Sequence, residues 1–291
     1  MKGITRNMLK IKNRPIGLTA IALLILVVVL SIASPHFSKL DNIINVFIQS
    51  SINATIAFGM TLVLLTGGID LSVGSVLAFC GIIFGMLLKQ EIPLIFSVLI
   101  CILLAGFVGL LNGLLVTRLS LPPFIATLGM MTISRGFALY ISNGRAISGF
   151  SGKLNIIGSG AVFSIPIMVI IVVMVFITIS FVLNQTRSGR YFYAIGGNAE
   201  ATRLSGINVQ KYTTFAYIIC GITSGIAAIL LTSRLDSAQP VAGTGYEMNA
   251  IAASVIGGTS LSGGEGKLIG TLLGALIISI LNNGLNLLNV S

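Results

Sequence analysis

Residues 92–117 read IPLIFSVLICILLAGFVGLLNGLLVT, a run of 26 residues without a charged side chain. A helix that crosses the hydrocarbon core of a bilayer needs about 20 predominantly apolar residues, whereas an apolar run inside a soluble domain is shorter. This run therefore predicts a transmembrane helix, and it indicates that the chain is an integral membrane protein.

Eight further apolar runs accompany it. The chain is 55% hydrophobic and only 8% charged, whereas a soluble domain carries about 25% charged residues. The first run follows a basic start but is too long for a signal-peptide core, so we expect an uncleaved span. We predict an all-α, polytopic transmembrane helix bundle, with residues 1–291 as a single integral membrane domain. Its nine predicted spans are residues 16–33, 43–66, 71–88, 92–117, 121–142, 162–183, 213–233, 246–262 and 268–288.

Basic residues at the ends of these runs predict the orientation. With the N-terminus in the cytoplasm, eleven lysines and arginines fall inside and five outside, which is the bias of the positive-inside rule. The loop at 184–212 then faces the cytoplasm, and the net charge of +10 reflects contact with anionic headgroups rather than nucleic acid. Nine spans leave the C-terminus outside, where the chain stops at Ser291 without a basic anchor. We therefore expect a tenth helix in the full-length protein.

Residues that would carry catalysis are missing from the sequence. It contains no phosphate-binding loop, no metal-binding histidine pair and no Ser-His-Asp candidate, and the single histidine, His36, lies at the edge of the first span. Cys80, Cys101 and Cys220 lie singly in apolar runs, as small buried hydrophobes do. We therefore predict neither an enzyme nor a cofactor or metal site in this chain.

Few ionisable residues are expected inside the membrane, namely Arg135, Asp70 and Glu247, and the first two each admit two interpretations. Arg135 lies about 10 Å from the outer end of its span, so its side chain either reaches the headgroups or has a role inside the bundle, where it lines the solute path or pairs with another helix. Asp70 follows Gly67-Gly68-Ile69. It either caps a helix that starts at this break or belongs to a broken helix beside the path.

Neutral polar side chains inside the spans are candidates for that path. Gln49 and Asn53 share one helix face at i, i+4 spacing, and such groups are costly when they face lipid. Amide and hydroxyl groups suit a neutral, hydrogen-bonding solute, although ordinary interhelical hydrogen bonds explain each of them equally well. The candidate path residues are Gln49, Asn53, Asp70, Asn112, Thr127 and Asn249.

The loop at 184–212 contains a predicted short helix over residues 199–204. Asn198 is its expected N-cap, and Glu200 is well placed in the first turn, where a negative charge is favourable. Gly206 is expected to end the helix in a left-handed conformation. A short rigid helix between two turns can be moved by a partner, although a well-ordered loop without that role fits the spacing too.

A weak internal repeat connects two glycine-rich segments. Residues 67–74 read GGIDLSVG and residues 257–264 read GGTSLSGG, and each follows a span that descends toward the cytoplasm. Duplicated halves are common in transporters, but five shared residues can also arise by chance.

Four strings carry a family resemblance: GIDLSVGS at 68–75, FIATL at 124–128, GRYFYAIGGN at 189–198 and ATRLSGINV at 201–209. They resemble the permease subunits of bacterial ATP-binding-cassette sugar importers. Residues 237–266 and the last eleven residues are similar to ribose permeases within that family. The resemblance extends from about residue 40 to residue 291.

The resemblance implies a subunit that forms the path for a simple sugar, ribose foremost, and hydrolyses nothing itself. ATP and Mg would bind a separate cytoplasmic ATPase, a second permease subunit would complete a homodimer, and an extracytoplasmic sugar-binding protein would deliver the solute. The chain would be a multi-pass protein of the bacterial inner membrane, in contact with lipid, and such permeases typically have ten spans. The implied coupling residues, which dock on the ATPase, are Gly197, Asn198, Glu200, Ala201, Thr202, Arg203, Leu204 and Gly206.

A second class of protein stays open from the residues alone, namely a stand-alone secondary transporter or channel for a neutral polar solute. Such a protein needs an ion- or proton-coupling site, and buried carboxylates are scarce in these spans.

Overall fold

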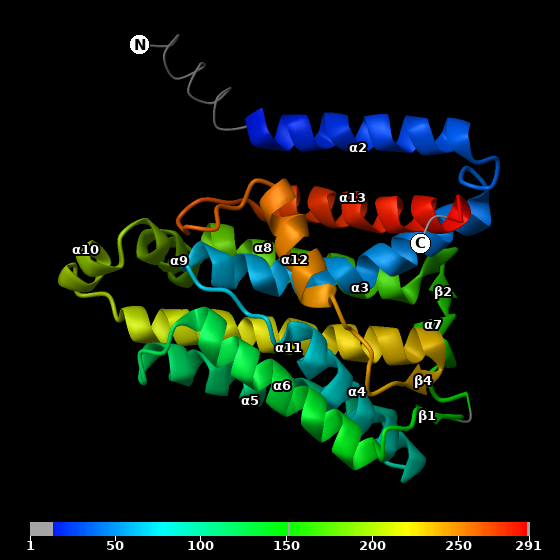
Figure 1. Cartoon of the computed structure of the whole chain (residues 1–291), viewed down its shortest axis with the longest axis horizontal. Coiled ribbons are helices and arrows are strands. Elements are labelled where there is room, and N and C mark those ends of the chain that lie inside the picture. The colour runs from blue at the N-terminus through cyan, green and yellow to red at the C-terminus, as the bar shows by residue number, and fades with distance from the viewer. Residues whose placement is uncertain (1–13, 151, 290–291) are drawn as a thin grey trace.

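The computed structural model of the chain describes residues 14–150 and 152–289, which fold as an elongated bundle of helices (Figure 1). The longer helices are α2 Arg14–Ala33, α3 Leu40–Leu65, α4 Val73–Lys89, α5 Leu94–Thr117, α6 Pro123–Ser142, α8 Ile167–Gln185, α9 Arg187–Gly197, α11 Val209–Leu235, α12 Tyr246–Ile256 and α13 Leu268–Leu287. The shorter elements are α7 Asn155–Gly158, α10 Ala199–Leu204, β1 Ile147–Ser148, β2 Ala161–Val162, β3 Ile165–Pro166 and β4 Ser237–Ala238. The predicted orientation and the expected tenth helix depend in part on residues that lie outside the described ranges, namely Lys2, Arg6, Lys10, Lys12, Val290 and Ser291.

Within residues 14–150 and 152–289, seven helices are long and apolar enough to cross a membrane, which confirms the all-helical membrane bundle; they are α2, α3, α5, α6, α8, α11 and α13. The prediction of nine spans is not confirmed. The run at 71–88 forms α4, which has 17 residues, and the run at 246–262 forms α12, which has 11. α12 ends early because Gly257 and Gly258 turn the chain there, and Gly258 has a φ of 92°.

α3 and α11 form the centre of the bundle. Twelve consecutive residues of α3, from Ala54 to Leu65, are buried, and α11 packs against α3, α4 and α5. The crossing of α5 and α11 is so close that a Cβ added at Gly109 would lie under 3.0 Å from the carbonyl oxygen of Tyr217. Small residues at such crossings allow helices to pack tightly in a membrane, where apolar burial from water does not drive association.

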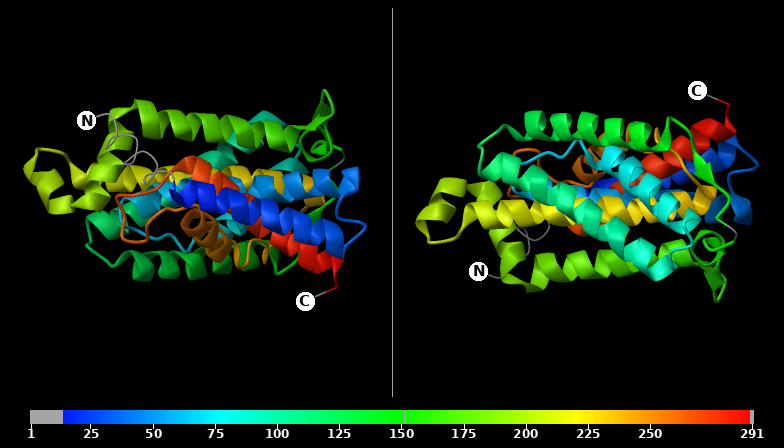
Figure 2. Two further views of the ribbon diagram at one scale, coloured as in Figure 1. Left: turned by 90° about the horizontal axis from the view of Figure 1, so that it is seen from above. Right: turned by 90° about the horizontal axis from the view of Figure 1, so that it is seen from below.

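α2 lies on the outside of the bundle. It crosses α13 (Figure 2), where Leu30 packs against Ile280 and Gly284. Most of its large apolar side chains are exposed, Leu24 and Ile32 among them, as expected for a helix that faces lipid. The three cysteines, all among the described residues, are buried as predicted, and they are free thiols.

The two ends of the bundle differ. At one end α9 and α10 project beyond the other helices, and we call this the α10 end (Figure 1). At the opposite end lie the antiparallel pairs β1–β4 and β2–β3.

α4 and α12 both begin part-way along the bundle, each after a stretch of irregular backbone (Figure 1). Their starts meet, because a Cβ added at Gly74 would approach both the carbonyl oxygen of Gly243 and the carboxylate of Glu247. Gly243 and Gly245, just before α12, have φ values of 69° and 83°, a region that favours glycine. The bundle therefore contains two interrupted helices whose N-terminal ends lie side by side.

Candidate functional site

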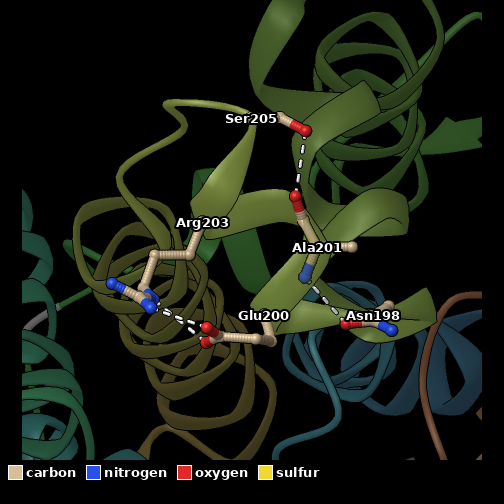
Figure 3. A network of polar contacts seen from close by, with 5 residues as sticks. All are labelled: Asn198, Glu200, Ala201, Arg203 and Ser205. Atoms are coloured by element: carbon tan, nitrogen blue, oxygen red, sulfur yellow. Dashed lines mark hydrogen bonds and ion pairs between the residues drawn. The ribbon is translucent and has the colours of Figure 1, made fainter.

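The α10 helix is capped as the sequence predicts. The Asn198 side chain accepts a hydrogen bond from the backbone N–H of Ala201 at 2.9 Å (Figure 3), which satisfies one of the free donors of the first turn. At the other end Gly206 has a φ of 82°, and its N–H donates to the carbonyl oxygen of Arg203. The predicted helix start and left-handed stop are both confirmed.

An ion pair spans the exposed face of α10. Arg203 donates to both carboxylate oxygens of Glu200, at 2.6 and 3.0 Å (Figure 3). The hydrogen bond that Glu200 accepts from Arg203 lowers the pKa of the Glu200 carboxyl from its ordinary value, and the same interaction raises the pKa of the Arg203 guanidinium. Both side chains are about two-thirds exposed, so water screens the pair and its main effect is to order this face. Leu204 beside it is 75% exposed, which leaves an apolar side chain uncovered at the tip.

Thr202 differs from the other predicted coupling residues because it is buried. Its hydroxyl donates to the carbonyl oxygens of Ala194 at 2.9 Å and Asn198 at 2.7 Å. Thr202 therefore joins α10 to α9, whereas the remaining seven predicted residues are exposed: Gly197, Asn198, Glu200, Ala201, Arg203, Leu204 and Gly206.

α9 connects α10 to the bundle through contacts that the sequence did not reveal. A Cβ added at Gly196 would lie under 3.0 Å from the carbonyl oxygen of Leu65 and from the backbone nitrogen of Gly264. The Tyr193 hydroxyl donates to the carbonyl oxygen of Gly266 at 3.0 Å. The α9–α10 unit therefore rests on the end of α3 and on the loop between α12 and α13. The sequence pattern does not distinguish Gly196, which packs against backbone, from Gly197 beside it, where an added Cβ would meet nothing within 4 Å.

The two segments of the internal repeat lie against each other at this place. A Cβ added at Gly263 would lie under 3.0 Å from the backbone nitrogen of Gly67, and Gly264 packs in the same way against Gly197. The two segments of the repeat therefore belong to loops whose backbones are in direct contact.

Asp70 is the centre of a buried polar cluster in the segment before α4. Its carboxylate accepts from the backbone N–H and the hydroxyl of Ser72, at 2.9 and 2.6 Å, and from the Asn112 amide at 3.4 Å. The Asn112 amide also donates to the Ser72 hydroxyl at 2.8 Å. The N-cap position of α4 is Ser72 rather than Asp70, so Asp70 stabilises the irregular backbone that precedes the helix.

Neighbouring helices hold the same segment from two further sides. The Tyr217 hydroxyl of α11 donates to the carbonyl oxygen of Ile69 at 3.2 Å, and the Thr127 hydroxyl of α6 lies 3.4 Å from that oxygen. Irregular backbone at membrane depth is tolerated where protein groups satisfy it. The structure therefore brings Asp70, Asn112 and Thr127 together, and all three are almost wholly buried.

The other three candidate path residues lie elsewhere and keep part of their surface exposed. Gln49 and Asn53 are on α3, where the Asn53 amide donates to the Ser279 hydroxyl of α13 at 3.2 Å. Asn249 is on α12. Interhelical hydrogen bonding, one of the two sequence interpretations, thus accounts for Asn53 in this conformation.

Arg135 pairs with protein groups instead of reaching toward headgroups. Its guanidinium donates to the carbonyl oxygens of Pro240 at 2.7 Å and Ala242 at 2.8 Å, both in the irregular segment before α12. α6 therefore holds the start of one interrupted helix through Arg135, and it borders the start of the other through Thr127.

Comparison with known proteins places this architecture in a family. Residues 42–291 match the family described as the branched-chain amino acid transport system permease component. The ribose import permease proteins of Haemophilus influenzae and Bacillus subtilis are each 47% identical to this chain, over 93% of it and 85% of the relative. The D-allose transport system permease protein of Escherichia coli is 39% identical, over 94% of this chain and 84% of its own. No solved structure matches the chain.

A permease of this kind works with an ATPase and a substrate-binding protein, and ATP hydrolysis belongs to the ATPase, so this chain is not an enzyme. The match over most of the chain therefore shows that it belongs to the permease components of ATP-binding-cassette importers, as a multi-pass protein of the inner membrane.

Proposed function

We propose that this chain forms the path for a simple sugar, with ribose as the first candidate, and that α10 couples it to the ATPase. The observation that carries the proposal is the α9–α10 unit: a capped, exposed helix whose support continues as backbone contacts into the loops beside both interrupted helices. The similarity to ribose import permeases supports the choice of sugar. A stand-alone transporter is not favoured, because the family works with a separate ATPase.

The proposed partners follow from the two ends of the bundle. The α10 end faces the cytoplasm together with the N-terminus, and the exposed side chains of α10 dock on the ATPase, which binds ATP and Mg. Asn198 and Gly206 set the two ends of the docking helix, and Thr202 fixes it to α9. The opposite end receives the sugar-binding protein, and a second copy of this chain completes a homodimer in the lipid bilayer.

Movement of α10 is proposed to reach the centre of the bundle in three steps. α9 moves with α10 because Thr202 ties them together. Gly196 then displaces the end of α3 and the loop after α12, since no side chain lies between them. Asp70 and Arg135 hold the starts of α4 and α12, so these two interrupted helices shift as units and open the path on one side or the other.

Each interrupted helix is proposed to cross the membrane together with the irregular segment before it, which would restore the nine crossings expected from sequence. The partly exposed Gln49, Asn53 and Asn249 then offer amides to sugar hydroxyls along the path. Asp70, Asn112 and Thr127 take part by shaping the broken helix rather than by meeting the solute in this conformation.

Uptake of labelled sugars tests this function directly. The chain is expressed with its own ATPase and sugar-binding protein in a bacterial strain whose pentose and hexose permeases are deleted. We expect accumulation of radiolabelled ribose that stops when the ATPase is inactivated by mutation. Uptake that persists without the ATPase would refute the coupling, and uptake of allose or xylose but not ribose would refute the sugar.

A further inference from the structure

A cavity of about 650 Å³ opens at the α10 end between the last turns of α5 and the first turns of α9 and α11. The basic part of the cavity is lined by Arg118, Ser188 and Lys211, which lie at the ends of α5, α9 and α11. The apolar part is lined by Leu110, Leu114 and Ile218, which lie further along α5 and α11. A ligand that fills this cavity has to match both parts.

The two basic side chains have no ionic partner in the part of the chain that the structure describes. Arg118 and Lys211 are exposed, the ion pair found among the described residues is that of α10, and the residues that line the cavity include no aspartate or glutamate. Ser188 lies in the first turn of α9, and Lys211 lies in the first turn of α11. Helix N-termini add partial positive charge, so the basic part of the cavity favours an anion.

The apolar part of the cavity is preformed and continues onto the lipid-facing surface. The packing of Gly113 on the backbone of Thr214 and a 2.9 Å hydrogen bond between the hydroxyls of Thr117 and Thr214 fix α5 against α11 there. Leu103 and Phe107 are exposed on α5 and share a helix face with Leu110 and Leu114, which line the cavity, since residues three and four apart are neighbours.

We propose that this cavity binds an anionic phospholipid, with the phosphate between Arg118 and Lys211 and an acyl chain along Leu110 and Leu114. A soluble phosphate compound satisfies only the basic part and leaves the apolar wall in water. A neutral lipid leaves the two cations without an anion. Only a ligand with both a phosphate and a hydrocarbon tail matches both parts of the cavity.

Lipid binding to the purified full-length chain tests the proposal, and no transport step enters the measurement. Fluorescent phosphatidylglycerol and phosphatidylcholine are titrated into detergent-solubilised protein. The R118Q/K211Q variant should bind phosphatidylglycerol about 30-fold more weakly, as expected when two basic residues are lost near an anionic group. The control variant K89Q/R145Q loses the same charge from exposed positions, the last residue of α4 and the segment just before β1, elements that meet at the end opposite α10 (Figure 1), and should bind like the wild type. Equal affinity of R118Q/K211Q and wild type would overturn the proposal.

Two further arms separate the lipid from free phosphate. Inorganic phosphate at concentrations that saturate ordinary anion sites should leave the labelled lipid bound, and its complete displacement would show that the tail is not recognised. Leu114→Gln should weaken phosphatidylglycerol binding without a change in elution or thermal stability, and unchanged lipid affinity would exclude the apolar wall from the site. Failure of these arms leaves the sugar path and the coupling helix unaffected.

Discussion

Replacing Gly196 with alanine should separate ATP hydrolysis from sugar movement. The added Cβ would lie under 3.0 Å from the carbonyl oxygen of Leu65 and the backbone nitrogen of Gly264. Both obstacles are backbone atoms, so no side chain can rotate out of the way, and α9 must shift away from the bundle. Gly197 is the matched control, because a Cβ there would meet nothing within 4 Å.

The magnitude follows from the packing. Overpacking of a close contact destabilises by about 1–3 kcal/mol, which corresponds to about a 5- to 150-fold change in the equilibrium between two conformations. At Gly197 the same substitution removes a glycine from the last turn of α9, so its effect on stability is at most about 1 kcal/mol and favourable in sign.

The assay is ribose uptake per ATP hydrolysed in proteoliposomes that contain the permease, its ATPase and the sugar-binding protein. Gly196→Ala should retain the copurifying ATPase, because α10 itself is unchanged, but uptake per ATP should fall at least fivefold. Gly197→Ala should match the wild type. Equal uptake per ATP in the two variants, both eluting as intact protein, would refute the transmission of movement through this contact.

Three further predictions concern the interrupted helices and α10. Arg135→Met removes two charge-assisted hydrogen bonds to the segment before α12 and should lower the stability of the purified protein by about 2–5 kcal/mol, measured by thermal unfolding. Arg135→Lys, which keeps a donor, should fall between it and the wild type. Asn198→Ala removes the cap of α10, worth about 1 kcal/mol, and should reduce ATPase copurification, whereas Asn198→Asp should not. Gly206→Ala strains a left-handed position by about 1 kcal/mol, and Glu200→Gln breaks the ion pair with Arg203. Both should reduce uptake per ATP without affecting membrane insertion, measured by fractionation. Because the folded pKa of Glu200 is lowered, its pair is present above the ordinary carboxyl pKa and is lost only as pH falls through the lower folded value. The Glu200→Gln defect should therefore be the same from about pH 6 to pH 8.

Hydropathy and capping chemistry were sufficient to predict much of the architecture. The run at 92–117 became α5 almost residue for residue, because an uncharged apolar helix has one stable environment in a bilayer. α10, Ala199–Leu204, is flanked by the N-cap Asn198 and the left-handed Gly206 as expected, because both rules depend on local backbone donors and on φ rather than on distant partners.

The features that the sequence did not predict have a common physical cause, since they depend on contacts between segments far apart in sequence. The run at 246–262 is apolar, but hydropathy does not register that Gly257 packs against the backbone of Gly270, where α12 has ended at Ile256. Nothing in the spacing shows that the Thr202 hydroxyl faces α9 while its neighbours are exposed. Gly196 and Gly197 look alike in sequence, and only the position of Leu65 distinguishes them.

The glycine contacts at Gly196, Gly263 and Gly264 also have an evolutionary consequence. Wherever main chain touches main chain, a substitution cannot be compensated by trimming the opposite side chain, because there is none to trim. Neighbouring surfaces can drift as paired changes accumulate, whereas this junction admits hardly any variation. Redesign of the permease for another cargo therefore has to leave these three positions alone and alter the walls around them.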